Sequence, residues 1–456
     1  MIKLKFLGAT ETVTGSKYLL TVDQQKILVD CGLFQGPKAL RERNWQPMPV
    51  DPKSIQAVVL THAHVDHSGY LPLLVRQGFR GPIYCTEATF DLCKILLPDS
   101  GHLQEEDAKY AVKHGFSRHH PPLPLYTRED ALVSLKQFRT LPYGTPFQIL
   151  KEGREGVVSF HHAGHILGAS FVQFEIEGVK ILFSGDIGRP HDALMNAPAI
   201  LQQTDYLVME STYGDRLHDA MDPKEELGAI IEATVQKGGS VLIPAFAVGR
   251  AQAILHHLLR LKQEGRIPNV PIFLDSPMAI SATGLLCKYA NEHHLSKSQC
   301  AAVSQLPIYA NTIDESKAIS SNPLPKIIVS ASGMLSGGRS VHHLKQLVSD
   351  NRNTIVLAGF QTPETRGARL MVGDREIKIH GEMFAVKARI ESLSNTSAHS
   401  DYQEILMWLK HFTHAPRMTF ITHGETHAAQ AMKGHVESEL HWPVQVPRYL
   451  DEVVLG

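Results

Sequence analysis

The densest group of chemically active side chains in the sequence lies in residues 61–67, which read THAHVDH. An apolar run that predicts a strand precedes this segment, and a predicted helix follows it. His62 and His64 lie two residues apart on extended chain, so their side chains point to the same side. Asp66 and His67 come where the chain turns and can face a second point nearby. Four imidazole or carboxylate groups within six residues predict a metal site, and this loop can serve two ions.

Three more candidate ligands come directly after predicted strands. His165 lies in HHAGHILG at residues 161–168, Asp186 in SGD at 184–186, and His423 in THGE at 422–425. Taken alone, Asp186 also fits a turn residue and His423 a helix cap. Their joint placement at strand ends, beside glycines that allow close backbone approach, favours one shared site.

This set of residues resembles the metallo-β-lactamase superfamily, in which H-x-H-x-D-H is followed by a lone histidine, an aspartate after a strand and a final histidine. Asp30, which ends a predicted strand before Cys31 and Gly32, resembles the first motif of that superfamily. The resemblance implies one site formed by His62, His64, His165 and Asp186. It implies a second site formed by Asp66, His67, His423 and a shared Asp186, with Asp30 orienting the ligands. Nitrogen and carboxylate donors without thiolate suit two Zn²⁺ ions per chain, and Mn²⁺ or Fe²⁺ is compatible with them.

Two further segments resemble motifs of the β-CASP nucleases. Glu210 in ESTYG at 210–214 is similar to motif A, His399 in SAHSD at 397–401 to motif B, and His423 to motif C. The segments PAFAVGRAQ at 244–252, DSPMA at 275–279 and SASGM at 330–334 are also similar to that family. A histidine at motif C accompanies its RNA-processing members, so the resemblance indicates single-stranded RNA as the partner. The nearest relatives implied are bacterial and archaeal homologues of the nuclease subunit of the cleavage and polyadenylation machinery.

The expected fold class is α/β, namely a metallo-β-lactamase αββα sandwich with an inserted β-CASP domain. From about residue 214, strands alternate with helices, which predicts a parallel sheet covered on both faces. Residues 1–210 and 392–456 are expected to form the metallo-β-lactamase domain, and residues 211–391 the inserted domain. Local patterns predict helices over Ala88–Leu97 and Gln104–His114, a proline-rich loop over Arg118–Pro124 and a strand over Phe384–Leu393. Ser276 and Pro277 predict a helix start.

The catalytic residues are expected to be Asp66, which is also a ligand, together with His399 and Glu210. A hydroxide held between two metal ions would attack the phosphodiester, because metal binding lowers the pKa of water to about 7. His399 would protonate the departing 3′-oxygen, and Glu210 would hold its imidazole in the protonated form. The expected activity is endonucleolytic hydrolysis of RNA in RNA processing or decay, with 5′-exonucleolytic activity as a further mode.

Phosphate contacts are expected from the inserted domain. Ser332, Gly333 and Met334 begin a glycine-rich turn that leads into a helix, where backbone amides can hold a phosphate. An ordinary glycine-rich turn is the alternative. Arg250, at the start of another helix, is expected either to bind phosphate or to solvate the helix end.

Two other functions compete with the nuclease. A small-molecule thioester or lactam hydrolase of the same superfamily would need no nucleotide-binding second domain, so the segment from about residue 214 to 391 argues against it. A non-catalytic RNA-binding subunit would be expected to have lost metal ligands, whereas all seven are present here.

Composition sets the remaining limits. The chain has 456 residues, a formal net charge of −1 and 43% hydrophobic residues, which suits a globular protein and excludes a general nucleic-acid coat. Its five cysteines form no C-x-x-C pair, which favours a reducing compartment over a disulfide framework. The N-terminus lacks the pattern of a signal peptide, and no apolar stretch approaches about 18 residues, so a cytoplasmic enzyme with no membrane partner is expected. The sequence leaves the oligomeric state open, a homodimer included.

Overall fold

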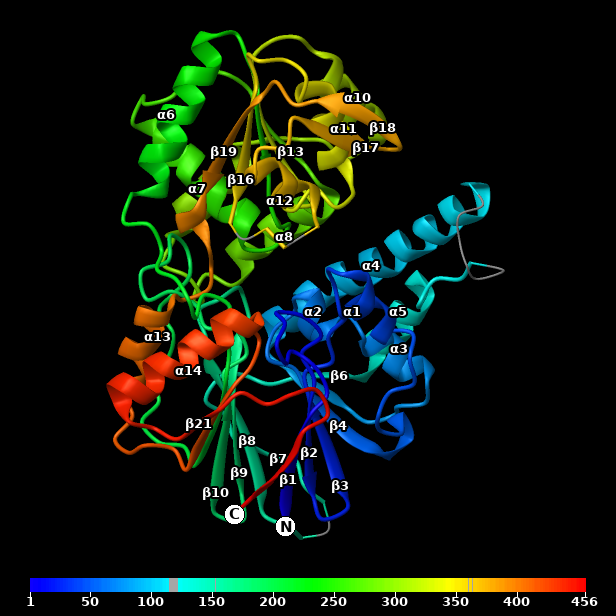
Figure 1. The fold of residues 1–456 in the computed structure, drawn as a ribbon, viewed down its shortest axis with the longest axis vertical. Helices are drawn as coiled ribbons and strands as arrows, with labels where there is room; N and C mark the ends of the chain where they lie inside the picture. Colours follow the sequence, from blue (N-terminus) through cyan, green and yellow to red (C-terminus); the bar gives the residue numbers. More distant parts are fainter. Residues whose placement is uncertain (115–121, 152, 360, 363) are drawn as a thin grey trace. The chain divides into compact units, whose positions relative to one another are not determined.

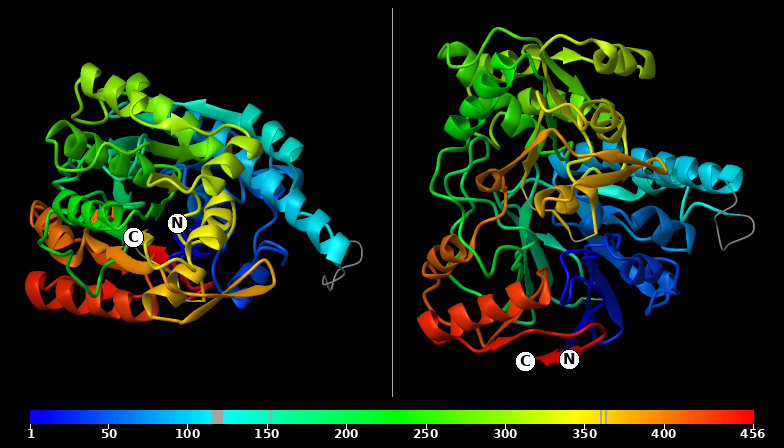
Figure 2. Two further views of the ribbon diagram at one scale, coloured as in Figure 1. Left: turned by 90° about the horizontal axis from the view of Figure 1, so that it is seen from above. Right: turned by 45° about the horizontal axis from the view of Figure 1, so that its top comes forward.

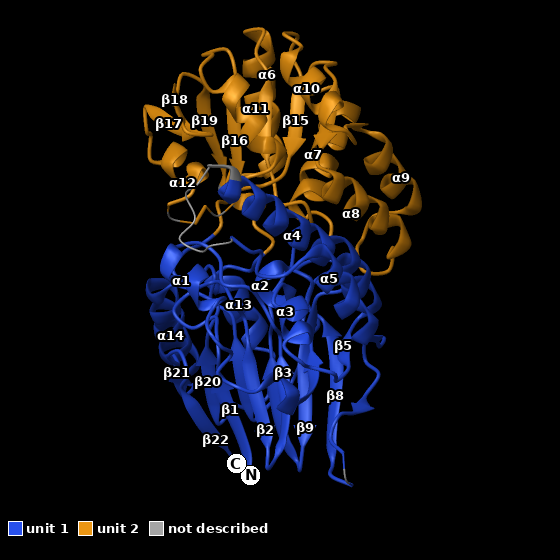
Figure 3. Cartoon of the chain, turned by 90° about the vertical axis from the view of Figure 1, so that its right-hand side faces the viewer, with its two compact units in different colours: residues 1–191, 196–217, 399–456 blue, residues 192–195, 218–398 orange. Residues whose placement is uncertain are grey.

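The computed structural model describes residues 1–114, 122–151, 153–359, 361–362 and 364–456, which form two compact units. Unit 1 comprises residues 1–191, 196–217 and 399–456, and unit 2 comprises residues 192–195 and 218–398 (Figure 3). The main segment of unit 2 begins and ends seven residues later than the insert expected at residues 211–391. Most of the proline-rich loop predicted at Arg118–Pro124 lies outside the described residues. Among the helices described, none is both long and apolar enough to cross a membrane.

Unit 1 is built on two seven-stranded sheets that lie face to face, with helices outside them, which confirms the expected αββα layering (Figure 1). The first sheet contains, in spatial order, β22 (Glu452–Leu455), β1 (Ile2–Phe6), β2 (Tyr18–Val22), β3 (Gln25–Val29), β4 (Ile55–Val59), β5 (Ile83–Cys85) and β6 (Phe138–Thr140). The second contains β21 (Val444–Gln445), β20 (Met418–Ile421), β11 (Tyr206–Met209), β10 (Val179–Phe183), β9 (Ser170–Ile176), β8 (Gly156–His162) and β7 (Phe147–Gln148). The helices are α1 (Lys38–Arg43), α2 (Val65–Ser68), α3 (Leu71–Arg76), α4 (Glu87–His114), α5 (Arg128–Ser134), α13 (Tyr402–Leu409) and α14 (Thr426–Leu440).

The core of unit 1 fills the space between its two sheets. Alternate residues of the strands point inward, and their aromatic rings meet across the layer, as between Phe6 and Phe420, whose centroids are 5.3 Å apart. Phe174 and Phe183 pack edge to face in the same cluster. Each such fully buried side chain contributes about 1.5–3 kcal/mol relative to an exposed one. Strand β1 also pairs antiparallel with β22, so the two ends of the chain lie side by side (Figure 2).

Unit 2 contains the predicted parallel sheet covered by helices. Its strands are, in spatial order, β14 (Ile308–Tyr309), β13 (Ile272–Asp275), β15 (Ile327–Ser330), β12 (Val241–Pro244), β16 (Thr354–Ala358) and β19 (Arg389–Leu393), with a separate hairpin of β17 (Glu376–Ile379) and β18 (Glu382–Ala385). Its helices are α6 (Pro223–Gln236), α7 (Arg250–Gln263), α8 (Pro277–Lys288), α9 (Lys297–Gln305), α10 (Ile313–Ser321), α11 (Arg339–Leu347) and α12 (Arg366–Met371). Single 3₁₀ turns occur at Pro52–Ser54 and Leu135–Gln137 in unit 1 and at Ser394–Thr396 in unit 2. The central strands β12, β15 and β16 are buried along their whole length, as covered parallel strands must be. The predicted start of α8 is confirmed, since the Ser276 side chain accepts from the Ala279 amide and Pro277 takes the first helical position.

The local predictions were wrong at two places. One helix, α4, runs unbroken through Pro98 where two helices were expected. Proline removes one backbone hydrogen bond of the helix, and the remaining hydrogen bonds and side-chain packing keep the helix continuous. Gly101 allows this close packing, because a Cβ there would come within 2.7 Å of the backbone at the start of α5. The single strand expected over Phe384–Leu393 is divided between β18 in the hairpin and β19 in the main sheet. Both segments have the residue pattern of a strand, but β18 pairs with β17 in the hairpin and β19 pairs with β16 in the main sheet.

Asp275, at the end of β13, is the centre of a buried polar network in unit 2. Its carboxylate accepts from Ser316 Oγ at 2.5 Å, from His343 Nε2 at 2.6 Å and from Arg339 Nη1 at 2.5 Å. Burial by itself would raise the pKa of Asp275, but the hydrogen bonds from these three side chains outweigh burial and lower the pKa. The network ties the end of β13 to helices α10 and α11.

We expect Asp275→Ala to lower the free energy of unfolding by about 3–5 kcal/mol at pH 7, because it leaves the buried His343 and the half-buried Arg339 without their shared carboxylate. Since the folded-state pKa is lowered, the stabilisation by Asp275 is complete above the ordinary carboxyl pKa and is lost as pH falls through the folded value. Urea unfolding at pH 7, 5, 4 and 3 measures both effects. The control Asp314→Ala removes a carboxylate that is 94% exposed and should change stability by less than about 0.5 kcal/mol. Equal stability of the Asp275 variant and the wild type at pH 7 would contradict this account.

Candidate metal centre

The candidate ligands all lie in unit 1, in loops and a short helix that follow strands. His62 and His64 follow β4, and helix α2 begins directly after them, which places Asp66 and His67 on its first turn. His165 follows β8. Strands β10, β11 and β20 are parallel neighbours, so Asp186, Glu210 and His423, which follow them, emerge at one edge of the sheet. In parallel sheets this carboxyl-terminal edge is the usual place for a functional site.

Four buried or half-buried side chains form the first ligand group. Nδ1 of His64 lies 3.2 Å from Nε2 of His62 and 3.2 Å from Nε2 of His165. Oδ2 of Asp186 lies 3.3 Å from His62 Nε2 and 3.5 Å from His165 Nε2. Tetrahedral zinc with bonds of about 2.0–2.1 Å separates its ligand atoms by about 3.3 Å, so these distances fit one ion.

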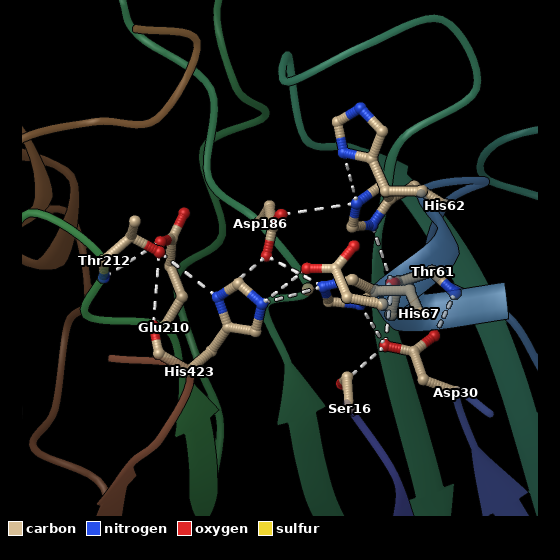
Figure 4. A network of polar contacts seen from close by, with 12 residues as sticks. Ser16, Asp30, Thr61, His62, His67, Asp186, Glu210, Thr212 and His423 are labelled. Atoms are coloured by element: carbon tan, nitrogen blue, oxygen red, sulfur yellow. Dashed lines mark hydrogen bonds and ion pairs between the residues drawn. The ribbon is translucent and has the colours of Figure 1, made fainter. Parts of the chain in front are cut away.

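Three further side chains form the second group. Nε2 of His423 lies 3.1 Å from Nε2 of His67 and 3.4 Å from Oδ2 of Asp66. The second oxygen of Asp186, Oδ1, lies 3.2 Å from His67 Nε2 and 3.4 Å from His423 Nδ1. Asp186 therefore presents one oxygen to each group, as a shared ligand would (Figure 4).

Asp30 fixes the orientation of His67. Its carboxylate is fully buried and accepts from Ser16 Oγ, from the amide and hydroxyl of Thr61, and from His67 Nδ1 at 2.7 Å (Figure 4). Because Nδ1 carries the hydrogen of this bond, the Nε2 of a neutral His67 presents its lone pair to the second group. Such a carboxylate–imidazole pair is the usual support of a metal-binding histidine.

The charges of the site also favour a bound cation. Burial by itself would raise the pKa of Asp186, but His423, His67 and His62 outweigh it and hold the pKa well below its usual range. Burial, with His62, lowers the pKa of His64 to about 3. The site therefore combines ionised carboxylates with a neutral imidazole at His64. Oδ1 of Asp186 has no hydrogen bond to any described residue although it is buried, and a cation would complete its coordination.

Glu210 and His399 form a pair at the edge of this centre. Both Glu210 carboxylate oxygens lie 3.1 Å from His399 Nδ1, and they also accept from the Ile187 and Thr212 amides. The opposite ring nitrogen of His399, Nε2, lies 4.0 Å from Asp186 Oδ2. Burial would lower the pKa of His399, but the charges of Glu210 and Asp186 outweigh it and raise the pKa to about 9. The pair thus directs one nitrogen of His399 toward the ligand groups.

The residues predicted to bind phosphate lie in unit 2 and are partly occupied by internal contacts. The Ser332 hydroxyl accepts from the Ser336 amide at 3.0 Å and from the Gly337 amide at 3.5 Å, so these two amides serve the turn itself. Arg250 begins α7 and is only 9% exposed, with its guanidinium packed against Gly359. Phosphate binding by Arg250, Ser332, Gly333 and Met334 stays a prediction.

Comparison with family models gives three matches along the chain. A model of the metallo-beta-lactamase superfamily matches residues 12–230, a Beta-Casp domain model matches residues 251–370, and a model of a Zn-dependent metallo-hydrolase RNA specificity domain matches residues 384–447. Ribonuclease TTHA0252 of Thermus thermophilus is 37% identical to this chain over 426 residues, which cover 92% of each protein. The chain belongs to the metallo-β-lactamase superfamily and carries a β-CASP domain.

Other relatives of this metallo-hydrolase agree with that assignment. Transcription termination factor FttA of Thermococcus kodakarensis is 32% identical, with 100% of this chain and 71% of the factor covered. The factor of the same name from Methanosarcina mazei is 30% identical over 96% of this chain and 69% of its own length. A crystal structure of a protein of unknown function from Enterococcus faecalis V583 matches the whole chain with a TM-score of 0.57 at 14% identity, which supports the fold alone. Membership of the superfamily implies divalent metal binding, and the two ligand groups are where such ions would lie.

Sequence reasoning missed several residues that hold this metallo-hydrolase centre together. The amide and hydroxyl of Thr61 donate hydrogen bonds to the Asp30 carboxylate, and its Oγ1 lies 3.1 Å from His62 Nδ1. The Ser16 hydroxyl also donates to Asp30. Thr212 contacts His423. Thr61 and Thr212 both lie within the recognised segments at 61–67 and 210–214, so position was the one available signal. Their partners lie far away in sequence and could not be read from it.

Proposed function

We propose that the chain is a metal-dependent ribonuclease that hydrolyses phosphodiester bonds of single-stranded RNA, mainly at internal positions and in a second mode from the 5′ end. The observation that carries the proposal is the arrangement around Asp186. This carboxylate faces both ligand groups and lies 4.0 Å from the Nε2 of His399, whose other nitrogen is held by Glu210. The two groups of metal ligands and the proposed proton donor, His399, therefore lie around the same carboxylate.

The metals proposed are two zinc ions. His62, His64, His165 and Asp186 would hold one, and Asp66, His67, His423 and Asp186 the other. Imidazole and carboxylate donors without thiolate suit zinc, and they also accept Mn²⁺ or Fe²⁺. When bound, such ions activate water at neutral pH and neutralise charge on the phosphate.

His399 is the proposed general acid. Glu210 is 1% exposed and is held by two backbone amides, so it fixes the imidazole without moving itself. Because Glu210 accepts from Nδ1, the Nε2 of a protonated His399 can give its hydrogen to the departing 3′-oxygen. The negative charge of Glu210, which is not a ligand in this scheme, is the largest cause that raises the pKa of His399 and so favours the protonated imidazole.

The comparisons support RNA as the substrate, since a relative that matches 92% of this chain is named a ribonuclease and residues 384–447 match an RNA specificity domain. A thioester or lactam hydrolase would use the same ligands, but the β-CASP match over residues 251–370 favours a polymer substrate. A non-catalytic subunit is disfavoured because all seven ligands converge. We further propose a cytoplasmic location, which the five free cysteines suit. A homodimer stays a prediction.

Incubating the purified protein with end-labelled single-stranded RNA tests this function. We expect internal cleavage that a strong chelator abolishes and that added Zn²⁺ or Mn²⁺ restores, with single-stranded DNA of the same sequence cut far less. Parallel assays with a thioester and a β-lactam address the rival function. Turnover of either compound, without cleavage of RNA by the metal-loaded protein, would refute the proposal.

A further inference from the structure

Thr212 makes two contacts with His423 from the loop after β11. Its side chain is 8% exposed, and Oγ1 lies 3.2 Å from the ring nitrogen Nδ1 of His423 and 3.2 Å from its backbone oxygen (Figure 4). The backbone amide of Thr212 donates to Glu210 Oε2 at 3.2 Å. One residue therefore touches both the pair that would supply the proton and a ligand of the second group.

The hydroxyl contacts determine which nitrogen of His423 carries hydrogen. A hydroxyl has one hydrogen, and a backbone carbonyl can only accept, so the contact with the His423 oxygen uses the hydrogen of Thr212. A lone pair of Oγ1 then faces Nδ1, and this contact is a hydrogen bond only if Nδ1 donates. Asp186 Oδ1 lies 3.4 Å from the same nitrogen and adds a negative charge that also favours a hydrogen there. The shorter Thr212 contact therefore favours the Nδ1–H tautomer of His423, against the Asp66 carboxylate, which would accept from Nε2 at 3.4 Å.

This tautomer leaves Nε2 of His423 with its lone pair free toward the second ligand group. Nε2 faces His67 Nε2 at 3.1 Å and Asp66 Oδ2 at 3.4 Å. Asp30 imposes the same tautomer on a neutral His67, so two nitrogen lone pairs point at each other. Two acceptors this close repel unless a proton or a metal cation lies between them, so in the neutral pair the tautomer prepares both nitrogens for metal binding.

The backbone at His423 is held by contacts other than those of Thr212. The His423 amide donates to the Ala9 oxygen at 2.7 Å, and the Ser211 amide donates to the His423 oxygen at 3.2 Å. The Ser211 side chain also donates to the Thr422 oxygen. Loss of the Thr212 hydroxyl should therefore release the imidazole ring while the turn stays in place.

We propose that Thr212 is a positioning residue that fixes the tautomer and orientation of His423 and thereby sets the affinity of the second metal ion. The inference rests on the metal centre of the proposed function. Thr212 would thus orient the ring of His423 as Asp30 orients the ring of His67.

Three variants test it: Thr212→Val, which keeps the shape and removes the hydroxyl, Thr212→Ser, which keeps the hydroxyl, and Thr212→Ala. Titration of the metal-free protein with Zn²⁺ against a chromophoric chelator measures the two affinities separately. We expect the second ion to bind about 10–100-fold more weakly to the valine variant, with the first ion unchanged and the serine variant close to wild type. In ¹⁵N spectra of the metal-free protein, the valine variant should lose the Nδ1–H signature of His423.

Unchanged affinity for the second ion in the valine variant would overturn the inference, as would equal weakening in the valine and serine variants. If valine prevents folding, the alanine and serine variants decide, because serine must bind the second ion more tightly than alanine does. Wild type that binds only one ion would instead contradict the two-metal centre itself. The two failures are therefore distinguishable.

Discussion

Replacing His399 with alanine should lower cleavage of single-stranded RNA by about 10²–10⁴-fold, which is the usual contribution of a positioned general acid. His399 is not a ligand in either group, so both metal ions should stay bound. Affinity for RNA should change little, because phosphate contacts with cations and amides dominate such binding. Rates under single-turnover conditions, metal content and RNA affinity measure the three quantities separately.

Comparing substrates with different leaving groups distinguishes proton donation by His399 from its other possible roles. A diester that releases p-nitrophenolate needs no proton, so its hydrolysis should be much less affected in the alanine variant. The control His414→Ala removes an exposed histidine of unit 1 and should leave both rates unchanged. Equal losses on the RNA and on the activated diester, with metals still bound, would show that His399 positions the phosphate instead.

Asp186→Ala should abolish detectable cleavage, because among the described residues this is the one carboxylate that faces both ligand groups. Its removal takes an anionic ligand from each ion. It also removes the negative charge next to His165 in the first group and His423 in the second. We expect metal affinity to fall by more than about 100-fold, since changes to residues that only support ligands already cost about 10–100-fold. Elemental analysis after dialysis should find the variant with fewer bound ions than the wild type.

Two further variants interpret that result. Asp186→Asn keeps the shape of the side chain and one oxygen, so a smaller loss of metal than with alanine is expected. Asp107→Ala removes an exposed carboxylate of α4 and should behave as wild type. Two ions bound to the alanine variant as tightly as to the wild type would rule out the shared role of Asp186.

Residue types and their spacing were enough to predict two groups of ligands. Residue types and spacing in residues 61–67 predicted a loop that serves two ions, and the structure places His62 and His64 in one ligand group and Asp66 and His67 in the other. This worked because the directions of side chains on an extended segment and on a first helical turn are local properties. The fold class implied by the family resemblance was also correct, and the parallel sheet of unit 2 was predictable because strands alternating with helices can pack in few ways.

How distant segments meet depends on the three-dimensional packing of the chain. Parallel pairing of β10, β11 and β20 brings Asp186, Glu210 and His423 to one edge, and that register depends on strand partners that no local pattern encodes. The same is true of the Thr212 hydroxyl, whose partner His423 lies 211 residues away. The helix through Pro98 and the division of β18 from β19 likewise follow from packing. Local sequence sets what a side chain can do, whereas its hydrogen-bond partners, and with them the tautomer of each imidazole, are fixed by contacts formed when the chain folds.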